Sequence, residues 1–133
     1  MKLSDYRSDY YYFSGAASGV ARQSSFAGIA LIWVFNTQTD TAIILPSELL
    51  WPTFFLIASL SCDLLHYISS TAIWGLFHRH KEKCGISENS EVNAPTYFNW
   101  PALAFFWGKN IFVLLGYCGL LIYVSKAIIF VST

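Results

Sequence analysis

The sequence is poor in charged residues. Lys, Arg, Asp and Glu make up 12% of its 133 residues, whereas about 25% is usual for a globular domain. The eight basic and eight acidic residues cancel, so the chain lacks the net positive charge that attracts nucleic acid over a broad surface, although a local basic patch stays open. A soluble protein this short needs a more charged surface, and the composition therefore favours a membrane protein.

Cysteine is also scarce, and the familiar catalytic motifs are missing. The three cysteines, Cys62, Cys84 and Cys118, form no close pair, which excludes a disulfide framework and favours free thiols used as small apolar side chains. The sequence contains no G-x-S-x-G, no H-E-x-x-H and no phosphate-binding glycine loop. The acidic clusters on which small three-span lipid kinases rely are missing as well. We therefore expect no enzymatic activity and no cofactor.

The N-terminus lacks the pattern of a cleavable signal peptide. Residues 1–13 carry Asp5, Asp9 and four tyrosines instead of a basic start, an apolar run and a small-residue cleavage site. We expect this segment to be retained and to lie along the inner membrane surface, because tyrosine favours the membrane–water interface. An aromatic tail that docks on a partner and a base-stacking platform for a nucleic acid are the alternatives.

What the sequence does contain is a long apolar run over residues 51–77. It carries one carboxylate, Asp63, and one histidine, His66. About 20 apolar residues are enough for a helix to cross the hydrocarbon core of a bilayer. The run therefore predicts a transmembrane helix.

Two further apolar segments accompany this run, so the predicted fold class is all-α, with three membrane-spanning helices in a homo-oligomeric bundle. Ser14 is placed to cap the first helix, and Ser47 with Glu48 to cap the second, after a turn at 36–40 and the break at Pro46. The single membrane domain divides into an interfacial segment 1–13, spans at 14–36, 52–78 and 100–130, and a cytoplasmic loop 79–99.

Basic residues predict the orientation of these spans. Arg79, Lys81 and Lys83 lie in the loop between the second and third spans, and Lys2 and Arg7 lie at the N-terminus, whereas residues 36–51 have none. Loops on the cytoplasmic side carry the excess of Lys and Arg. We therefore expect a multi-pass protein of the bacterial inner membrane with its N-terminus in the cytoplasm and its C-terminus outside.

Polar residues recur on one face of the central helix and at matching depth on its neighbours. Helical spacing places Ser59, Asp63, His66 and Ser70 on one face. A rise of about 1.5 Å per residue puts further polar side chains near the same level; these are Arg22, Lys109 and Asn110. Because an isolated charge there costs several kcal/mol, we expect Asp63 to pair with Arg22 or Lys109. Two interpretations stay open, a structural salt bridge between helices and a polar constriction in a pore formed by several copies.

Small residues in the first helix predict close helix packing. Gly15 with Gly19, and Ser24 with Gly28, follow the small-xxx-small spacing that lets two membrane helices approach closely.

The segment HRHKEK that follows the central helix allows two weaker hypotheses. His78, His80 and Cys84 are spaced as zinc ligands, but a fourth ligand is missing, so we expect no metal and favour a basic flank that fixes the topology. The same flank with Tyr97, Phe98 and Trp100 mixes cations and aromatic rings as single-strand nucleic-acid sites do. An interfacial aromatic belt is the favoured alternative.

The run SDYYYFSGAASGVARQSSFAGIALIWVF, together with three short spans, resembles small bacterial membrane proteins encoded beside nucleotidyltransferases in antiphage operons, the Hailong-type effectors. The resemblance implies an oligomeric ion channel held shut by a single-stranded DNA oligomer that the companion enzyme makes. Candidate ligand-binding residues are chosen only by their charge, by neighbouring aromatic rings and by their expected position on the inner side of the membrane. They are Lys2, Arg7, Tyr10, Tyr11, Tyr12, Arg79, Lys81 and Lys83.

The function that we predict is a small membrane effector whose copies form an ion-conducting pore and depolarise the cell when triggered, in antiphage defence gated by a nucleic-acid or nucleotide ligand. The partners would be the lipid bilayer, further copies of the chain and that ligand. A holin-like lysis protein and a non-conducting accessory subunit of a membrane complex are the alternatives.

Overall fold

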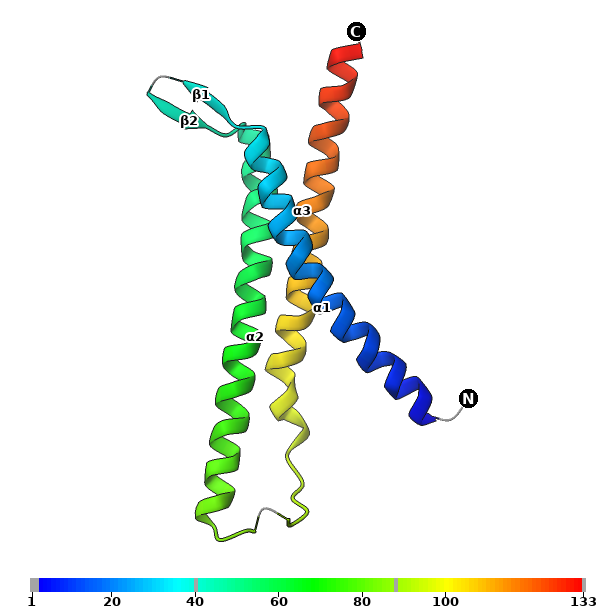
Figure 1. The fold of residues 1–133 in the computed structure, drawn as a ribbon, viewed down its shortest axis with the longest axis vertical. Coiled ribbons are helices and arrows are strands. Elements are labelled where there is room, and N and C mark those ends of the chain that lie inside the picture. The colour runs from blue at the N-terminus through cyan, green and yellow to red at the C-terminus, as the bar shows by residue number, and fades with distance from the viewer. Residues whose placement is uncertain (1–2, 40, 88, 133) are drawn as a thin grey trace.

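A computed structural model describes residues 3–39, 41–87 and 89–132 (Figure 1). Over these residues the chain is mainly helical, with a small hairpin and two short 3-10 turns, so the predicted all-α class is confirmed. The elements in chain order are α1 (Leu3–Val34), β1 (Thr37–Thr39), β2 (Ala42–Ile44), η1 (Ser47–Leu49), α2 (Leu50–Lys83), η2 (Thr96–Asn99) and α3 (Trp100–Ser132).

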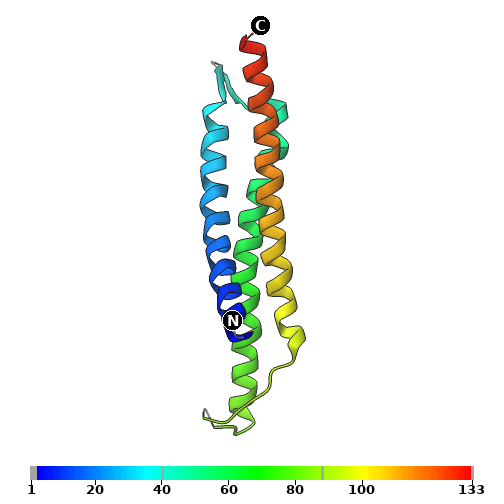
Figure 2. The same cartoon turned by 90° about the vertical axis from the view of Figure 1, so that its right-hand side faces the viewer.

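The helices α2 and α3 run antiparallel and lie side by side, and α1 crosses them at an angle (Figures 1 and 2). The C-terminal half of α1 packs on both, whereas its N-terminal half leads away from α2 (Figure 1). A core of buried aliphatic side chains joins the three helices near the hairpin end. It consists of Ile32, Leu49, Leu56 and Leu120.

The first helix starts earlier than the sequence indicated. We expected it to begin at Ser14, but α1 is continuous from Leu3, and the Ser14 hydroxyl donates to the Tyr11 carbonyl at 3.2 Å inside the helix instead of capping it. No proline interrupts residues 3–14, and each added residue extends a nucleated helix at little cost. The tyrosines predicted to lie in a separate interfacial segment are therefore helical.

The connection between α1 and α2 contains structure that we did not predict. Strands β1 and β2 pair antiparallel with Thr37 opposite Ile44, because threonine and isoleucine are β-branched and suit an extended backbone. Ser47 and Glu48 lie in η1, where no side chain makes a capping hydrogen bond. The predicted cap of the second helix is therefore wrong.

A glycine ends α2. Gly85 has φ 75°, its N–H donates to the Glu82 carbonyl at 3.0 Å, and the Ile86 N–H donates to the Lys81 carbonyl at 3.3 Å. This pair of bonds is the Schellman motif, which needs a left-handed residue after the helix.

Replacing Gly85 with alanine should lower the free energy of unfolding by about 1 kcal/mol, because a side chain disfavours the left-handed conformation. Thermal unfolding in detergent, followed by circular dichroism, measures this loss. Gly75→Ala is the matched control, since a Cβ at Gly75 within the same helix meets nothing within 4 Å. Equal melting temperatures for the two variants would contradict the assignment.

Two helical segments within the described residues are long and apolar enough to cross a membrane, Ser47–Lys83 and Thr96–Ser132. The helix α1 is not one of them. Arg22 and Gln23 interrupt its more apolar half, and Asp5, Arg7 and Asp9 lie in its first half.

Candidate functional site

Three charged side chains, one from each long helix, meet where α1 crosses the other two. Asp63 of α2 accepts from the Arg22 Nε at 2.6 Å through Oδ2 and from the Lys109 Nζ at 2.6 Å through Oδ1. The predicted pairing of Asp63 with a cation is confirmed, and both candidate cations take part. We call Arg22, Asp63 and Lys109 the charged cluster.

Hydroxyl groups complete the coordination of the charged cluster. The Lys109 ammonium also donates to the Ser18 hydroxyl, and Arg22 Nη2 donates to the Tyr67 hydroxyl at 3.0 Å. Because Asp63 has no other charged partner among the described residues, the charged cluster carries two formal positive charges against one negative charge.

A second chain of hydroxyl groups lies beside the charged cluster. The Ser59 hydroxyl of α2 donates to the Lys109 carbonyl of α3 at 2.9 Å, and it lies 3.2 Å from the Ser25 hydroxyl of α1. Ser25 and Ser59 are both buried. Polar contacts therefore join all three helices at this level.

The three members of the charged cluster differ in exposure. The side chain of Lys109 is 1% exposed and that of Asp63 is 10% exposed, but that of Arg22 is 41% exposed. Arg22 also lies over the ring of Tyr67, with its guanidinium carbon 5.4 Å from the ring centroid, and Tyr67 is itself 54% exposed. The Lys109 side chain of the charged cluster is thus buried, whereas the Arg22 side chain is accessible from outside the subunit.

Not every residue of the predicted polar layer joins the charged cluster. The Asn110 side-chain amide donates to the Phe106 carbonyl of its own helix at 2.7 Å and makes no hydrogen bond to a member of the charged cluster among the described residues. His66 lies beside the charged cluster and lines a neighbouring cleft. Ser70 lies about one further turn along α2 and is half-buried.

Three further residues lie in this region that were not predicted from the sequence, Ser18, Ser25 and Tyr67. Helical spacing would have found them, because Ser18 and Ser25 lie four residues before and three after Arg22, and Tyr67 lies four after Asp63. Small polar residues at such offsets from a charged residue share its face.

The small residues of α1 divide into a packed and an open set. A Cβ at Gly28 would lie 2.7 Å from Leu56, and the Ser24 carbonyl accepts from the Tyr117 hydroxyl at 2.8 Å. At Gly15 and Gly19 a Cβ would meet nothing within 4 Å. Of the two predicted pairs, Ser24 with Gly28 therefore serves helix packing within one subunit, and Gly15 with Gly19 does not.

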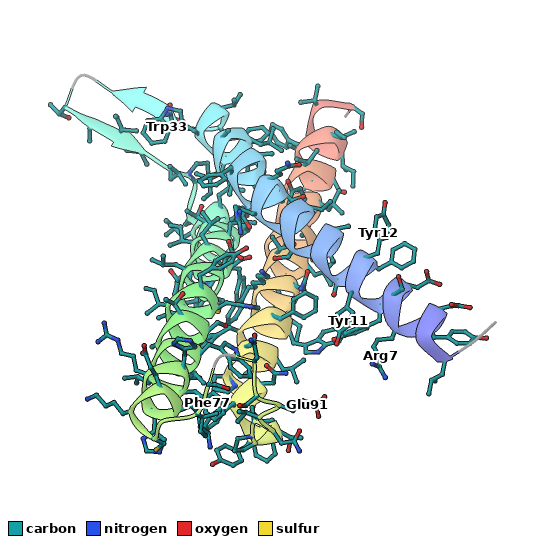
Figure 3. The ribbon with its side chains drawn as sticks, turned by 60° about the horizontal axis from the view of Figure 1, so that its bottom comes forward. Arg7, Tyr11, Tyr12, Trp33, Phe77 and Glu91 are labelled. Atoms are coloured by element: carbon teal, nitrogen blue, oxygen red, sulfur yellow. The ribbon has the colours of Figure 1, made fainter. Side chains whose placement is uncertain are left out.

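The candidate ligand-binding residues do not come together in one subunit. Tyr10 and Tyr11 line the cleft beside His66, whereas Tyr12 leaves α1 on the side opposite to Tyr11 (Figure 3). The start of α1, which carries Arg7, lies away from the end of α2 (Figure 1), and that end of α2 carries Arg79, Lys81 and Lys83. Lys2 lies outside the described residues.

Of the three aromatic residues Tyr97, Phe98 and Trp100 after the loop, Phe98 packs against α2. The ring centroid of Phe98 lies 6.2 Å from that of Trp74 and 5.5 Å from that of Phe77, while Tyr97 and Trp100 are exposed. Phe98 thus packs the start of α3 against the end of α2.

The proposed zinc ligands are only partly brought together. The Cys84 Sγ lies 4.0 Å from the His80 Nε2. Over residues 3–39, 41–87 and 89–132, no three His, Cys, Asp or Glu side chains are grouped as a metal site.

Comparisons of the chain with protein-family models, with curated proteins and with solved structures found no match.

Proposed function

We propose that the chain spans the membrane three times, that several copies associate in the bilayer, and that the assembly passes ions. Two helical segments are long and apolar enough to cross a membrane, and they support a location in the bilayer. In this proposal α1 is the third span, the N-terminus is cytoplasmic, and the C-terminus is outside.

The exposure of Arg22 is the observation that carries this proposal. Arg22 lies twelve residues before the end of α1, which is roughly 18 Å of helix, and Asp63 lies thirteen residues after the start of α2, roughly 20 Å. In a hydrocarbon core about 30 Å thick, both depths lie inside the hydrocarbon, roughly 10 Å from the inner surface. The 41% exposed side chain of Arg22 would then face acyl chains at a cost of several kcal/mol. A neighbouring copy or a water-filled path removes that cost.

The inner end of the subunit supplies the second part of the proposal, a nucleic-acid or nucleotide ligand that controls conduction. Arg79, Lys81 and Lys83 lie in the last turns of α2, and tyrosines cover the first half of α1. Cations combined with exposed aromatic rings bind single strands through charge and stacking. Since these residues lie apart within one subunit, the ligand would bridge neighbouring copies in this proposal.

A non-conducting accessory subunit is the second candidate function. Both carboxylate oxygens of Asp63 are paired inside one subunit, and the side chain is only 10% exposed. A salt bridge that only locks three helices together would have this geometry.

Flux through reconstituted vesicles separates the two candidates. Liposomes that contain the purified full chain, loaded with KCl and a potential-sensitive dye, should lose an imposed membrane potential. Arg22→Gln should strongly reduce this loss, because it removes the charge that the proposed path exposes. The matched control is Gln23→Leu, a change at the adjacent exposed position, which should leave the flux near that of the natural sequence.

Vesicles that hold their potential with the protein incorporated would overturn the conducting role and favour the accessory subunit. Equal flux for Arg22→Gln and Gln23→Leu would exclude Arg22 from the path. Addition of a single-stranded DNA oligomer to the side of the N-terminus should decrease the flux, and an unchanged flux would exclude that ligand.

A further inference from the structure

An open cleft of about 550 Å³ separates the N-terminal half of α1 from α2 and α3. It lies next to the charged cluster on the side of the N-terminus, because Ser18, His66 and Phe106 each lie three or four residues from a cluster member. Residues of all three helices and the end of η2 line it.

A positive charge lies directly behind the wall of this cleft. The Lys109 ammonium donates to Ser18, which lines the cleft, and lies 5.7 Å from the ring centroid of Phe106, another lining residue. Asp63 is shared between Lys109 and Arg22, so one of the two positive charges has no counter-charge in the charged cluster. The field in the cleft therefore favours an anion.

His66, which lines the cleft, has a ring nitrogen without a hydrogen-bond partner. Its Nδ1 is buried and has no partner among the described residues. A buried polar atom of this kind costs free energy unless a ligand or water satisfies it. A hydroxyl group can either donate to such a nitrogen or accept from it, so a ligand that combines an anionic group with a hydroxyl would suit both the charge and His66.

The remaining walls suit an amphiphile that enters from the side. Ala102, Leu103 and Phe106 supply apolar surface, and a Cβ at Gly15 would meet nothing within 4 Å, so that side of the cleft is unobstructed. The cleft begins at Asn99, next to the 69% exposed Trp100. Exposed tryptophan marks the level of lipid headgroups.

We propose that this cleft binds the headgroup of an anionic phospholipid of the phosphatidylglycerol class from the inner leaflet. The phosphate lies in the field of Lys109, and a glycerol hydroxyl forms a hydrogen bond with His66. The acyl chains leave through the open side along Leu103. A zwitterionic ethanolamine headgroup fits less well, because its ammonium meets the excess positive charge. The inference rests on the membrane placement of the proposed function and not on conduction.

Lipid retention tests this site. The full chain is reconstituted in nanodiscs of equimolar phosphatidylglycerol and phosphatidylethanolamine, extracted mildly, and its retained lipids are quantified by mass spectrometry. We expect phosphatidylglycerol to be enriched about fivefold, the factor that one unbalanced positive charge is worth next to an anionic headgroup. Gly15→Leu should abolish this enrichment by filling the cleft, and His66→Leu should reduce it.

Gly19→Leu is the matched control. It makes the same change one turn away on α1, at a position that is equally open but does not line the cleft, and it should retain phosphatidylglycerol like the natural sequence. Circular dichroism confirms that both leucine variants keep their helices. Retained lipid of the same composition as the bilayer, or enrichment that survives Gly15→Leu, would overturn the proposal.

A second copy of the chain is the competing occupant of the cleft. Gly15→Cys allows a check, because copies whose α1 helices meet symmetrically at this position of the cleft would form a disulfide across it. Efficient crosslinking between copies at this position would overturn the lipid site. Failure to crosslink, together with the enrichment above, supports it. Both results are independent of whether vesicles conduct.

Discussion

Asp63→Ala should lower the free energy of unfolding by about 3–5 kcal/mol, the usual loss when one partner of a buried ion pair is removed. The substitution leaves the Lys109 ammonium, 1% exposed, facing Arg22 without the carboxylate that now separates them. The loss therefore combines an unpaired buried charge with repulsion between two cations. Unfolding in a graded mixture of mild detergent and dodecyl sulfate, followed by circular dichroism, measures it.

Ser61→Ala provides the control for this experiment, because the Ser61 hydroxyl is exposed and bonds only to the Ile57 carbonyl of its own helix among the described residues. A double variant, Asp63→Leu with Lys109→Met, should be more stable than Asp63→Ala, since it removes the buried cation together with its partner. Asp63→Ala as stable as Ser61→Ala would show that the charged cluster contributes nothing to the fold.

Gly116→Ala should destabilise the subunit by about 1–3 kcal/mol, the range for overpacking in a tight core. A Cβ at this position would lie 2.8 Å from Leu56 Cδ2 and 3.3 Å from the Pro52 carbonyl oxygen. Leu56 is fully buried and also contacts Gly28, so it has no free direction in which to retreat. The helices α2 and α3 would have to separate.

A double-mutant cycle with Leu56→Ala identifies the cause of this loss. In the Leu56→Ala background the extra methyl group at position 116 has room, so Gly116→Ala should add little further destabilisation. The same unfolding experiment measures all four proteins, and Gly75→Ala again controls for helix propensity. A loss that is the same in both backgrounds would show that Leu56 is not the obstacle.

The sequence predicted those features that depend on composition and on the length of a helix. The apolar runs on either side of the polar loop predicted most of the residues of α2 and α3. A constant rise per residue placed Arg22, Asp63 and Lys109 at one depth, and the contacts between their side chains bear this out.

Features that depend on how each helix is rotated could not be obtained in this way. Asn110 shares the depth of Lys109, but adjacent residues of a helix point about 100° apart, so only one of them faces Asp63. Depth alone also left open which cation pairs with Asp63, because that depends on the crossing angle of α1. Likewise, no local signal separates a tyrosine-rich helix that starts at Leu3 from an extended segment on a membrane surface.

The helices α2 and α3 pack against each other both near the hairpin and near the polar loop. Leu56 seated against Gly116 holds it near the hairpin, and Phe98 seated against Trp74 and Phe77 holds it near the loop. In the first half of α1, a Cβ at Gly15 or Gly19 would meet nothing within 4 Å, and the Ser18 hydroxyl accepts from the Lys109 ammonium. A rigid-body movement of part of this subunit would therefore involve residues 3–18. These residues would pivot at the Ser18–Lys109 hydrogen bond, and the tyrosine side chains would be displaced most.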